Sequence, residues 1–352
     1  MKIGILEGDD IGLEIVPECV KVMKVAAART GVDIDWHPLP IGKKALDELG
    51  NTFPPGTLEA LDALDGWVLG PIGHRAYPKA DNAKNPHPVI RQHFELYANI
   101  KPVKSYPTLP ALHQNVDLII VRELLEGMPP DRNTFGGCGE FRPSPDMTVS
   151  VRVITRHSSN RIARAAFDLA RNRRKKLTAV HKNTVFKLGC GMFSEECHKV
   201  AAEYPDVEFN EVMVDTFAMK LVMQPQQFDV VVTTNTFGDI LTDEAAGLVG
   251  GLGMAPGLAA GPRHAMAQAT HGSAPDIAGR NIANPYAMIM SGQMLLEHLG
   301  RVHNEPSAVE AGQLIQRAMD KVIAERRALT PDLGGDGGTS QMGDAIAAAI
   351  AA

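Results

Sequence analysis

Two aspartates, Asp239 and Asp243, stand four residues apart directly after an apolar run that ends at Thr234. On a helix that starts there, residues four apart share one face. The carboxyl end of a buried strand is also where open α/β sheets collect their ligands. Converging carboxylates repel each other unless a cation joins them, and all-oxygen ligands favour Mg²⁺ or Mn²⁺. A second interpretation stays open here, because acidic residues also favour the start of a helix without any metal.

A segment rich in turn formers, His271-Gly272-Ser273-Ala274-Pro275-Asp276-Ile277-Ala278-Gly279, is followed by Asn284. An acidic side chain near a nucleotide ribose can hold the 2′-hydroxyl and repel a 2′-phosphate, which favours NAD over NADP. A turn-rich loop with no ligand is the alternative. No true G-x-G-x-x-G follows the first predicted strand, so the dinucleotide fingerprint of a Rossmann fold is absent.

Three cations, Arg91, Lys101 and Arg122, lie near apolar runs. The planar guanidinium suits a carboxylate, although each such residue alone is also typical of a surface ion pair. The basic run 171–176 is predicted to be the solvated end of a helix, and Cys190, Cys197 and His198 lack the spacing of zinc ligands.

The elements that must position these residues alternate between strands and helices. Helical spacing follows residue 12 and recurs over 159–169, residues 147–153 alternate like a half-exposed strand, and the alanine-rich tail 345–352 is expected to be a frayed terminal helix. Strands interleaved with helices predict an α/β protein with buried, largely parallel strands. The predicted buried strands are 3–6, 67–70, 116–121 and 229–234.

Composition limits the function classes. The chain has 352 residues, 44% apolar and 22% charged, which predicts about two domains, each with its own core. The net charge of −6 argues against a nucleic-acid partner. No apolar run approaches the roughly 20 residues of a membrane span, and the amino terminus does not resemble a secretion signal. With only four cysteines in addition, we expect a cytoplasmic protein without a disulfide framework.

Taken in order, these motifs resemble those of the β-decarboxylating dehydrogenase family, which includes isopropylmalate, isocitrate, homoisocitrate and tartrate/D-malate dehydrogenases. The resemblance runs from Gly4 to Gly338. The segments that carry it are Gly8-Asp9-Asp10-Ile11-Gly12, Arg91 with Leu96-Tyr97-Ala98-Asn99-Ile100-Lys101-Pro102, Val121-Arg122-Glu123, His181-Lys182, Val214-Asp215, the Asp239/Asp243 segment, His271–Gly279 with Asn284, and Thr330-Pro331-Asp332-Leu333-Gly334-Gly335.

The resemblance implies an α/β fold of the isopropylmalate/isocitrate dehydrogenase type, with two domains and without a true Rossmann fingerprint. Residues 1–99 and 250–352 would form the large NAD-bearing domain, and 100–249 the small domain for dimerisation, metal and substrate. The expected assembly is a homodimer, although nothing in the sequence excludes a tetramer. Lys182 and Asp215 of one subunit would meet Arg91, Arg122, Asp239 and Asp243 of the other.

The resemblance also implies the roles of these residues. Asp215, Asp239 and Asp243 would hold Mg²⁺ or Mn²⁺, and Lys182 with Asp215 would be catalytic. Arg91, Lys101, Arg122 and Tyr77 would bind a hydroxy di- or tricarboxylate. The residues implied for NAD are Ile11, His271, Gly272, Ser273, Ala274, Asp276 and Asn284. The implied reaction is oxidation of a (2R)-2-hydroxy acid by NAD⁺, followed by loss of the carboxylate on the next carbon.

Three positions depart from the family pattern. Pro129 stands where the family carries the tyrosine that protonates the enol left by decarboxylation, Lys101 replaces an arginine, and Thr184 replaces an asparagine. Tyr77 and His74 are candidates for the missing proton donor. Two alternatives therefore stay open, namely oxidation without decarboxylation and a non-catalytic regulatory subunit that binds a nucleotide or an acid. The sequence does not identify the hydroxy acid.

Overall fold

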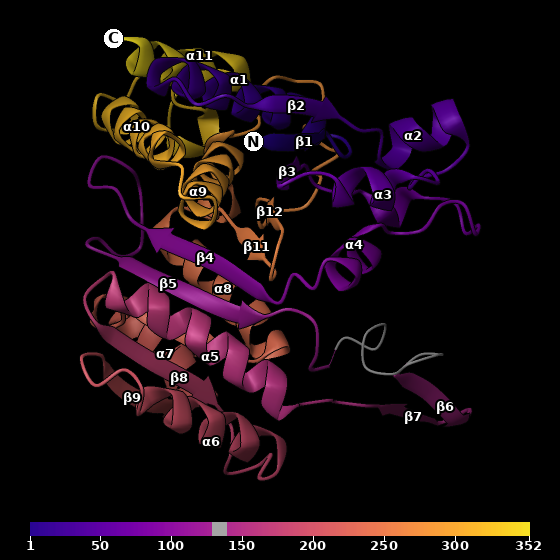
Figure 1. Ribbon diagram of the computed structural model, residues 1–352, viewed down its shortest axis with the longest axis vertical. Helices are drawn as coiled ribbons and strands as arrows, with labels where there is room; N and C mark the ends of the chain where they lie inside the picture. Colours follow the sequence, from indigo (N-terminus) through magenta and orange to yellow (C-terminus); the bar gives the residue numbers. More distant parts are fainter. Residues whose placement is uncertain (129–138) are drawn as a thin grey trace.

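The computed structural model describes residues 1–128 and 139–352 and confirms the predicted α/β class (Figure 1). Ten of its described strands form one large sheet, in the order β2-β1-β3-β12-β11-β4-β5-β10-β8-β9, and β6 and β7 form a separate pair. The strands of this sheet are β1 (Lys2–Leu6), β2 (Asp35–Pro38), β3 (Gly66–Leu69), β4 (Ala98–Lys104), β5 (Asp117–Glu123), β8 (Lys176–His181), β9 (Glu208–Met213), β10 (Val230–Thr233), β11 (Leu258–Ala260) and β12 (Ala265–Ala267).

Helices cover both faces of the sheet. The α-helices are α1 (Gly12–Thr30), α2 (Gly42–Leu49), α3 (Thr57–Asp62), α4 (His87–His93), α5 (Arg156–Arg171), α6 (Gly189–Ala201), α7 (Val214–Met223), α8 (Asn235–Val249), α9 (Tyr286–Val302), α10 (Pro306–Ala324) and α11 (Thr339–Ala351). Short 3₁₀ turns are η1 (His74–Ala76), η3 (Pro225–Gln227), η4 (Leu252–Met254) and η5 (Pro331–Leu333).

The sheet has a parallel half at each end and an antiparallel centre. Strands β5, β10, β8 and β9 are parallel to one another, as are β2, β1, β3 and β12, whereas β12-β11-β4-β5 pair antiparallel. The long apolar runs account for the predicted buried strands, which are confirmed as β1, β3, β5 and β10. The other strands of this sheet, β2, β4, β8, β9, β11 and β12, were not predicted from the sequence. Strands β11 and β12 give little signal, because each has three residues and consists mostly of alanine.

The hydrophobic cores follow this division. Helices α1, α9, α10 and α11 pack on one another beside the β1 half, while α5 with α6, and α7 with α8, cover opposite faces of the β5–β9 half (Figure 1). The domain boundaries at residues 99 and 250 stay a prediction, since the sheet is continuous through β4 and β11.

Two expectations about the surface were wrong. The alanine-rich tail belongs to α11, which packs on α1 and α10 and buries Ile346 and Ile350, so it is not a frayed end. Residues 147–153 were expected to be half-exposed, but among the described strands β7 (Met147–Ser150) pairs with β6 (Glu140–Ser144) alone, and both strands are exposed along their length. The pair forms an arm that projects from the body (Figure 1).

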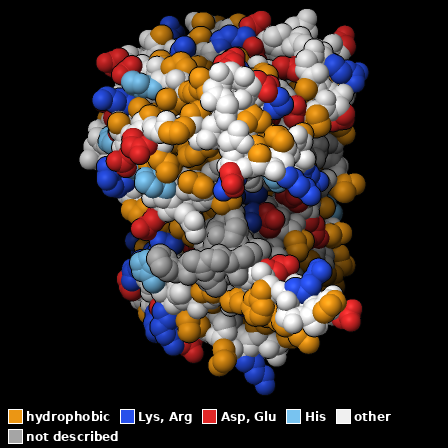
Figure 2. Space-filling model, turned by 90° about the vertical axis from the view of Figure 1, so that its right-hand side faces the viewer, with side chains coloured by type: hydrophobic (Ala, Val, Ile, Leu, Met, Phe, Trp, Pro, Cys, Tyr) orange, Lys and Arg blue, Asp and Glu red, His pale blue; other side chains and the backbone are white. Residues whose placement is uncertain are grey.

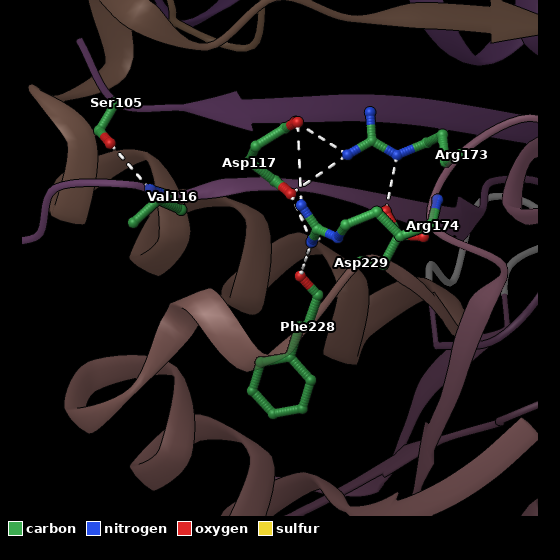
Figure 3. A network of polar contacts seen from close by, with 7 residues as sticks. All are labelled: Ser105, Val116, Asp117, Arg173, Arg174, Phe228 and Asp229. Atoms are coloured by element: carbon green, nitrogen blue, oxygen red, sulfur yellow. Dashed lines mark hydrogen bonds and ion pairs between the residues drawn. The ribbon is translucent and has the colours of Figure 1, made fainter. Parts of the chain in front are cut away.

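The basic run after α5 also differs from the expected solvated helix end. Asp229 is 1% exposed and accepts hydrogen bonds from the Arg173 side chain (Nε–Oδ1 2.8 Å) and from the Arg174 backbone N–H (2.9 Å). Arg174 also donates to the carbonyls of Asp117 and Phe228, at 2.9 and 2.6 Å (Figure 3). Buried carboxylates need such partners, so the two arginines fix the amino-terminal ends of β5 and β10.

No helix in the described ranges 1–128 and 139–352 is both long enough and apolar enough to span a membrane.

Candidate active site

Arg122 lies near the carboxyl end of β5, on the face covered by α8. Asn235, the first residue of α8, accepts hydrogen bonds from Arg122 Nε (3.2 Å) and Nη2 (2.6 Å), and Asp239 forms an ion pair with Nη1. The approach is close because Gly238 has no side chain, and a Cβ there would lie 2.6 Å from Arg122 Cγ. Arg122 itself is only 9% exposed. The guanidinium is therefore held at the edge of the sheet by α8.

Lys101 lies beside Arg122 on the same face. It is 7% exposed, and its Nζ donates to the hydroxyl of Thr242 on α8 at 3.2 Å. Burial lowers the pKa of Lys101 to about 8, and the positive charge of Arg122 contributes to the same shift. Lys101 is thus a buried amine without an ion pair among the described residues.

Asp239 and Asp243 are both exposed and lie on the same side of α8, one helical turn apart. This confirms the shared helix face that their spacing predicts. Partial burial raises the pKa of Asp243, while Lys101 opposes the rise and Asp239 adds to it. The charge of Asp239 therefore acts directly on Asp243.

Arg91 reaches this region from α4, on the other side of the sheet centre. Its Nη2 donates to Gln268 Oε1 at 3.1 Å, and Gln268 Nε2 lies 2.7 Å from Nε2 of His87. The charge of Arg91 contributes to the lowered pKa of Lys101, so Arg91, Lys101 and Arg122 share one electrostatic environment. Figure 2 shows acidic and basic side chains in a hollow between the two halves of one face of the molecule.

Lys182 and Asp215 form a separate pair at the ends of β8 and β9. Lys182 Nζ donates to Asp215 Oδ2 at 2.7 Å, and this hydrogen bond lowers the pKa of Asp215. Within residues 1–128 and 139–352, no three His, Cys, Asp or Glu side chains are grouped as a metal would require. A single chain therefore brings Asp239 and Asp243 together but does not add Asp215 to them.

Tyr77 faces away from solvent, which the sequence did not indicate. Its hydroxyl donates to Asp9 Oδ2 at 2.5 Å, and the backbone N–H groups of Gly73 and Lys43 donate to the same carboxylate at 2.7 and 2.6 Å. Burial and the negative charge of Asp9 raise the pKa of Tyr77. In this conformation the Tyr77 hydroxyl stabilises a buried carboxylate, while His74, the other candidate proton donor, is exposed.

The predicted cofactor loop meets the turn before α1. The backbone N–H of Ile11 donates to the carbonyl of Ser273 at 3.1 Å, next to Gly272 and to Ala274, whose φ is 43°. Nδ1 of His271 lies 2.9 Å from the Gly272 carbonyl, whereas its Nε2 is buried with no hydrogen-bond partner among the described residues. Asp276 is exposed on the same loop.

Asn284, which follows this loop, is buried. Its Nδ2 donates to Asp332 Oδ2 at 2.9 Å, and its Oδ1 accepts from the N–H of Tyr286 at 2.9 Å. The carboxy-terminal segment that carries Asp332 is thereby joined to the loop, through residues that are 48 positions apart.

Four residues that contact the predicted site were not found from the sequence, and they are Asp9, Asn235, Thr242 and Gln268. Asn235 offered the only local signal, because it occupies the first position of a helix directly after a buried strand. Position 129, where the family tyrosine is replaced by proline, lies outside the described residues.

Comparison with known proteins identifies the family. Residues 2–346 match the model of the isocitrate/isopropylmalate dehydrogenase family. The 3-isopropylmalate dehydrogenase of Methanothermobacter thermautotrophicus is 40% identical over 99% of this chain and 98% of its own. The isocitrate/homoisocitrate dehydrogenase of Thermus thermophilus is 38% identical over 99% and 98%. The crystal structure of isocitrate dehydrogenase from Methylococcus capsulatus superposes with a TM-score of 0.87, at 41% identity over 99% of both chains. The chain therefore belongs to the isocitrate/isopropylmalate dehydrogenase family of decarboxylating hydroxy-acid dehydrogenases.

Proposed function

We propose that this protein uses NAD⁺ and Mg²⁺ or Mn²⁺ to oxidise and decarboxylate a (2R)-2-hydroxy acid that carries a carboxylate on the next carbon. The observation that carries the proposal is a group of three basic side chains, Arg91, Lys101 and Arg122. Their charges act on one another and on the exposed carboxylates Asp239 and Asp243 beside them. Three cations suit the negative charges of a di- or tricarboxylate, and two oxygen ligands on one helix face suit a hard divalent ion.

The fit for a nucleotide is supported by His271. Burial lowers the pKa of this imidazole, which keeps it neutral, and Nδ1 donates to the Gly272 carbonyl. Nε2 is therefore a buried acceptor to which no group in residues 1–128 and 139–352 donates. Buried polar atoms are nearly always satisfied, and an N–H group of a bound base would supply the partner. Asp276 on the same loop is the carboxylate that favours NAD over NADP.

The fit for a divalent ion requires a second copy of the chain, because Asp215 does not join Asp239 and Asp243 within one chain. Helix α7 exposes Met219, Val222 and Met223 at positions i, i+3 and i+4, and α8 exposes Ile240. An exposed apolar face of this kind is typical of an interface between copies. A homodimer through α7 and α8 would bring Lys182 and Asp215 of one subunit to Asp239 and Asp243 of the other.

The residues then divide the work as follows. Arg91 and Arg122 hold the carboxylates of the substrate and orient its hydroxyl toward Lys182. Lys182 takes up the hydroxyl proton, and Asp215 holds its amine in place. When bound, the cation supplies Lewis acidity toward the hydroxyl oxygen, and NAD⁺ supplies the hydride acceptor.

The reaction is tested with the purified protein, Mg²⁺ and NAD⁺, screened against D-malate, tartrate, isopropylmalate, isocitrate and homoisocitrate. NADH formed without any partner subunit supports the proposal and excludes a purely regulatory role. CO₂ released in proportion to NADH separates oxidative decarboxylation from simple oxidation. Absence of NADH with every acid contradicts the proposal.

The shared site is tested by mixing two inactive variants, Lys182→Met and Asp243→Asn, after unfolding and refolding them together. A mixed dimer has one site with both original residues, so random pairing restores about a quarter of the normal activity. Refolding each variant alone is the control. If the mixture stays as inactive as its components, the site does not form between subunits.

A further inference from the structure

Decarboxylation of a β-keto acid requires a proton donor. When the bond between the carbon and its carboxylate breaks, CO₂ leaves and the electron pair forms an enolate. The carbon must then receive a proton so that the electrons return to the ketone. This requirement follows from the proposed function, and the inference below rests on that function.

Few groups around the described site can supply this proton. The guanidinium groups of Arg91 and Arg122 do not release one in proteins. The Lys182 amine is held by Asp215 at 2.7 Å, and the proposed function uses it at the hydroxyl of the substrate rather than at the carbon that loses its carboxylate. The sequence contains no tyrosine between Tyr106 and Tyr204, and the Tyr77 hydroxyl is engaged in a hydrogen bond to Asp9.

Lys101 differs from each of these groups. Its amine lies beside Arg122, on the face of β4 that is turned toward α8, and its hydrogen-bond acceptor is the neutral hydroxyl of Thr242 at 3.2 Å. No ion pair joins Lys101 to a carboxylate in the described part of the chain. A proton on this amine is therefore not held by a direct ion pair.

We propose that Lys101 is the general acid that protonates the carbon from which the carboxylate departs. The Nζ–H bond breaks as the new C–H bond forms, and Lys101 is left as a neutral amine that takes a proton from water. The family pattern has arginine at this position, and this chain has lysine. The difference is then functional, since an ammonium can release a proton and a guanidinium cannot.

The electrostatic environment supports this role. Burial brings the pKa of Lys101 to about 8, close to the pH at which such an acid is effective. The charged groups that face it are Arg122 on β5, Arg91 on α4, and Asp239 and Asp243 on α8. The arginines favour release of the proton, and the aspartates favour its retention.

The test uses the substrate that gives NADH in the screen, isopropylmalate or isocitrate, with the reaction run in D₂O. The wild-type protein is expected to place deuterium on one face of the product carbon. Lys101→Arg keeps the charge but removes the acid, so the enolate takes deuterium from solvent on both faces. The matched control is Lys104→Arg on the same strand, whose amine is paired with Asp320 at 3.0 Å. NMR of the product distinguishes the two stereoisomers.

The pH profile gives a second readout. The wild-type decarboxylation rate should fall as pH rises through the pKa of Lys101, and this alkaline limb should be absent in Lys101→Arg. Thr242→Val removes the acceptor of the ammonium and should move the limb to lower pH, which keeps the proposal testable if Lys101→Arg does not fold.

One-sided deuteration and an unchanged alkaline limb in Lys101→Arg would overturn the role of Lys101 while leaving the proposed function intact. Failure of the wild-type protein to form NADH is the separate result that contradicts the proposed function itself.

Discussion

Gly238→Ala tests whether the close packing of α8 on Arg122 contributes to the stability of the fold and to the activity of the enzyme. A Cβ at position 238 would lie 2.6 Å from Cγ and 2.8 Å from Cβ of Arg122, and 3.1 Å from Cγ2 of Thr233. The two distances to Arg122 are too short for carbon atoms, and the distance to Thr233 is tight. A change of the Arg122 rotamer would move its Cγ but not its Cβ, which is fixed by strand β5, so the helix must shift.

The size of the effect follows from two opposing contributions. Alanine is about 1 kcal/mol better than glycine inside a helix, while overpacking a well-packed site costs about 1–3 kcal/mol. We expect a net loss of up to about 2 kcal/mol in the free energy of unfolding. Displacing the guanidinium also removes a charge-assisted hydrogen bond to the substrate, worth about 1.5–3 kcal/mol, so kcat/KM should fall about 10- to 100-fold.

The control is Gly247→Ala, in the same helix, where an added Cβ meets nothing within 4 Å. That variant should gain about 1 kcal/mol and keep its kcat/KM. Urea unfolding and initial rates of NADH formation measure both variants. If Gly238→Ala gains as much stability as Gly247→Ala and keeps full activity, the close packing of α8 on Arg122 is not what positions the arginine.

Three further predictions concern single side chains. Burial raises the pKa of Glu123 from 4.5 to about 7, so the folded protein binds a proton in this window that the unfolded chain releases. Stability then falls by about 3 kcal/mol as pH rises through the window, and Glu123→Gln should abolish this loss in urea unfolding at pH 5 and pH 8. Asp276→Lys should shift the ratio of kcat/KM for NAD⁺ over NADP⁺ toward NADP⁺ by at least about tenfold, and an unchanged ratio would refute its contact with the ribose. Tyr77→Phe removes a hydrogen bond to the buried Asp9 and should lower the free energy of unfolding by about 2 kcal/mol with little change in kcat. A large fall in kcat at unchanged stability would instead show that Tyr77 takes part in the reaction.

Much of the fold could be predicted from the sequence, because the signals are local. Apolar runs such as 116–121 and 229–234 are long enough to identify buried strands, and helical spacing identifies α1 and α5. The antiparallel centre could not be predicted. Strand β11 is three residues long, and its pairing with β4 depends on segments more than 150 residues apart.

The site residues show the same difference between local and long-range information. The spacing of Asp239 and Asp243 already places them on one helix face, because four residues make about one turn. By contrast, the contacts of Arg122 with Asn235 and of Arg91 with Gln268 join residues 113 and 177 positions apart, which no local pattern reveals. The inward orientation of Tyr77 likewise depends on the distant carboxylate of Asp9.

The two partners of Arg122 differ in a way that matters for the proposed function. Asn235 is neutral and 1% exposed, so it holds the guanidinium in place whether or not a ligand is bound. The side chain of Asp239 is 61% exposed, and an ion pair so open to water contributes at most about 1 kcal/mol. A substrate carboxylate can therefore replace Asp239 on Arg122 at little cost, and Asp239 is then left without its cation. If Asp239 holds a divalent ion as proposed, this exchange would make it a stronger ligand when substrate is present, so substrate and metal should each favour the binding of the other.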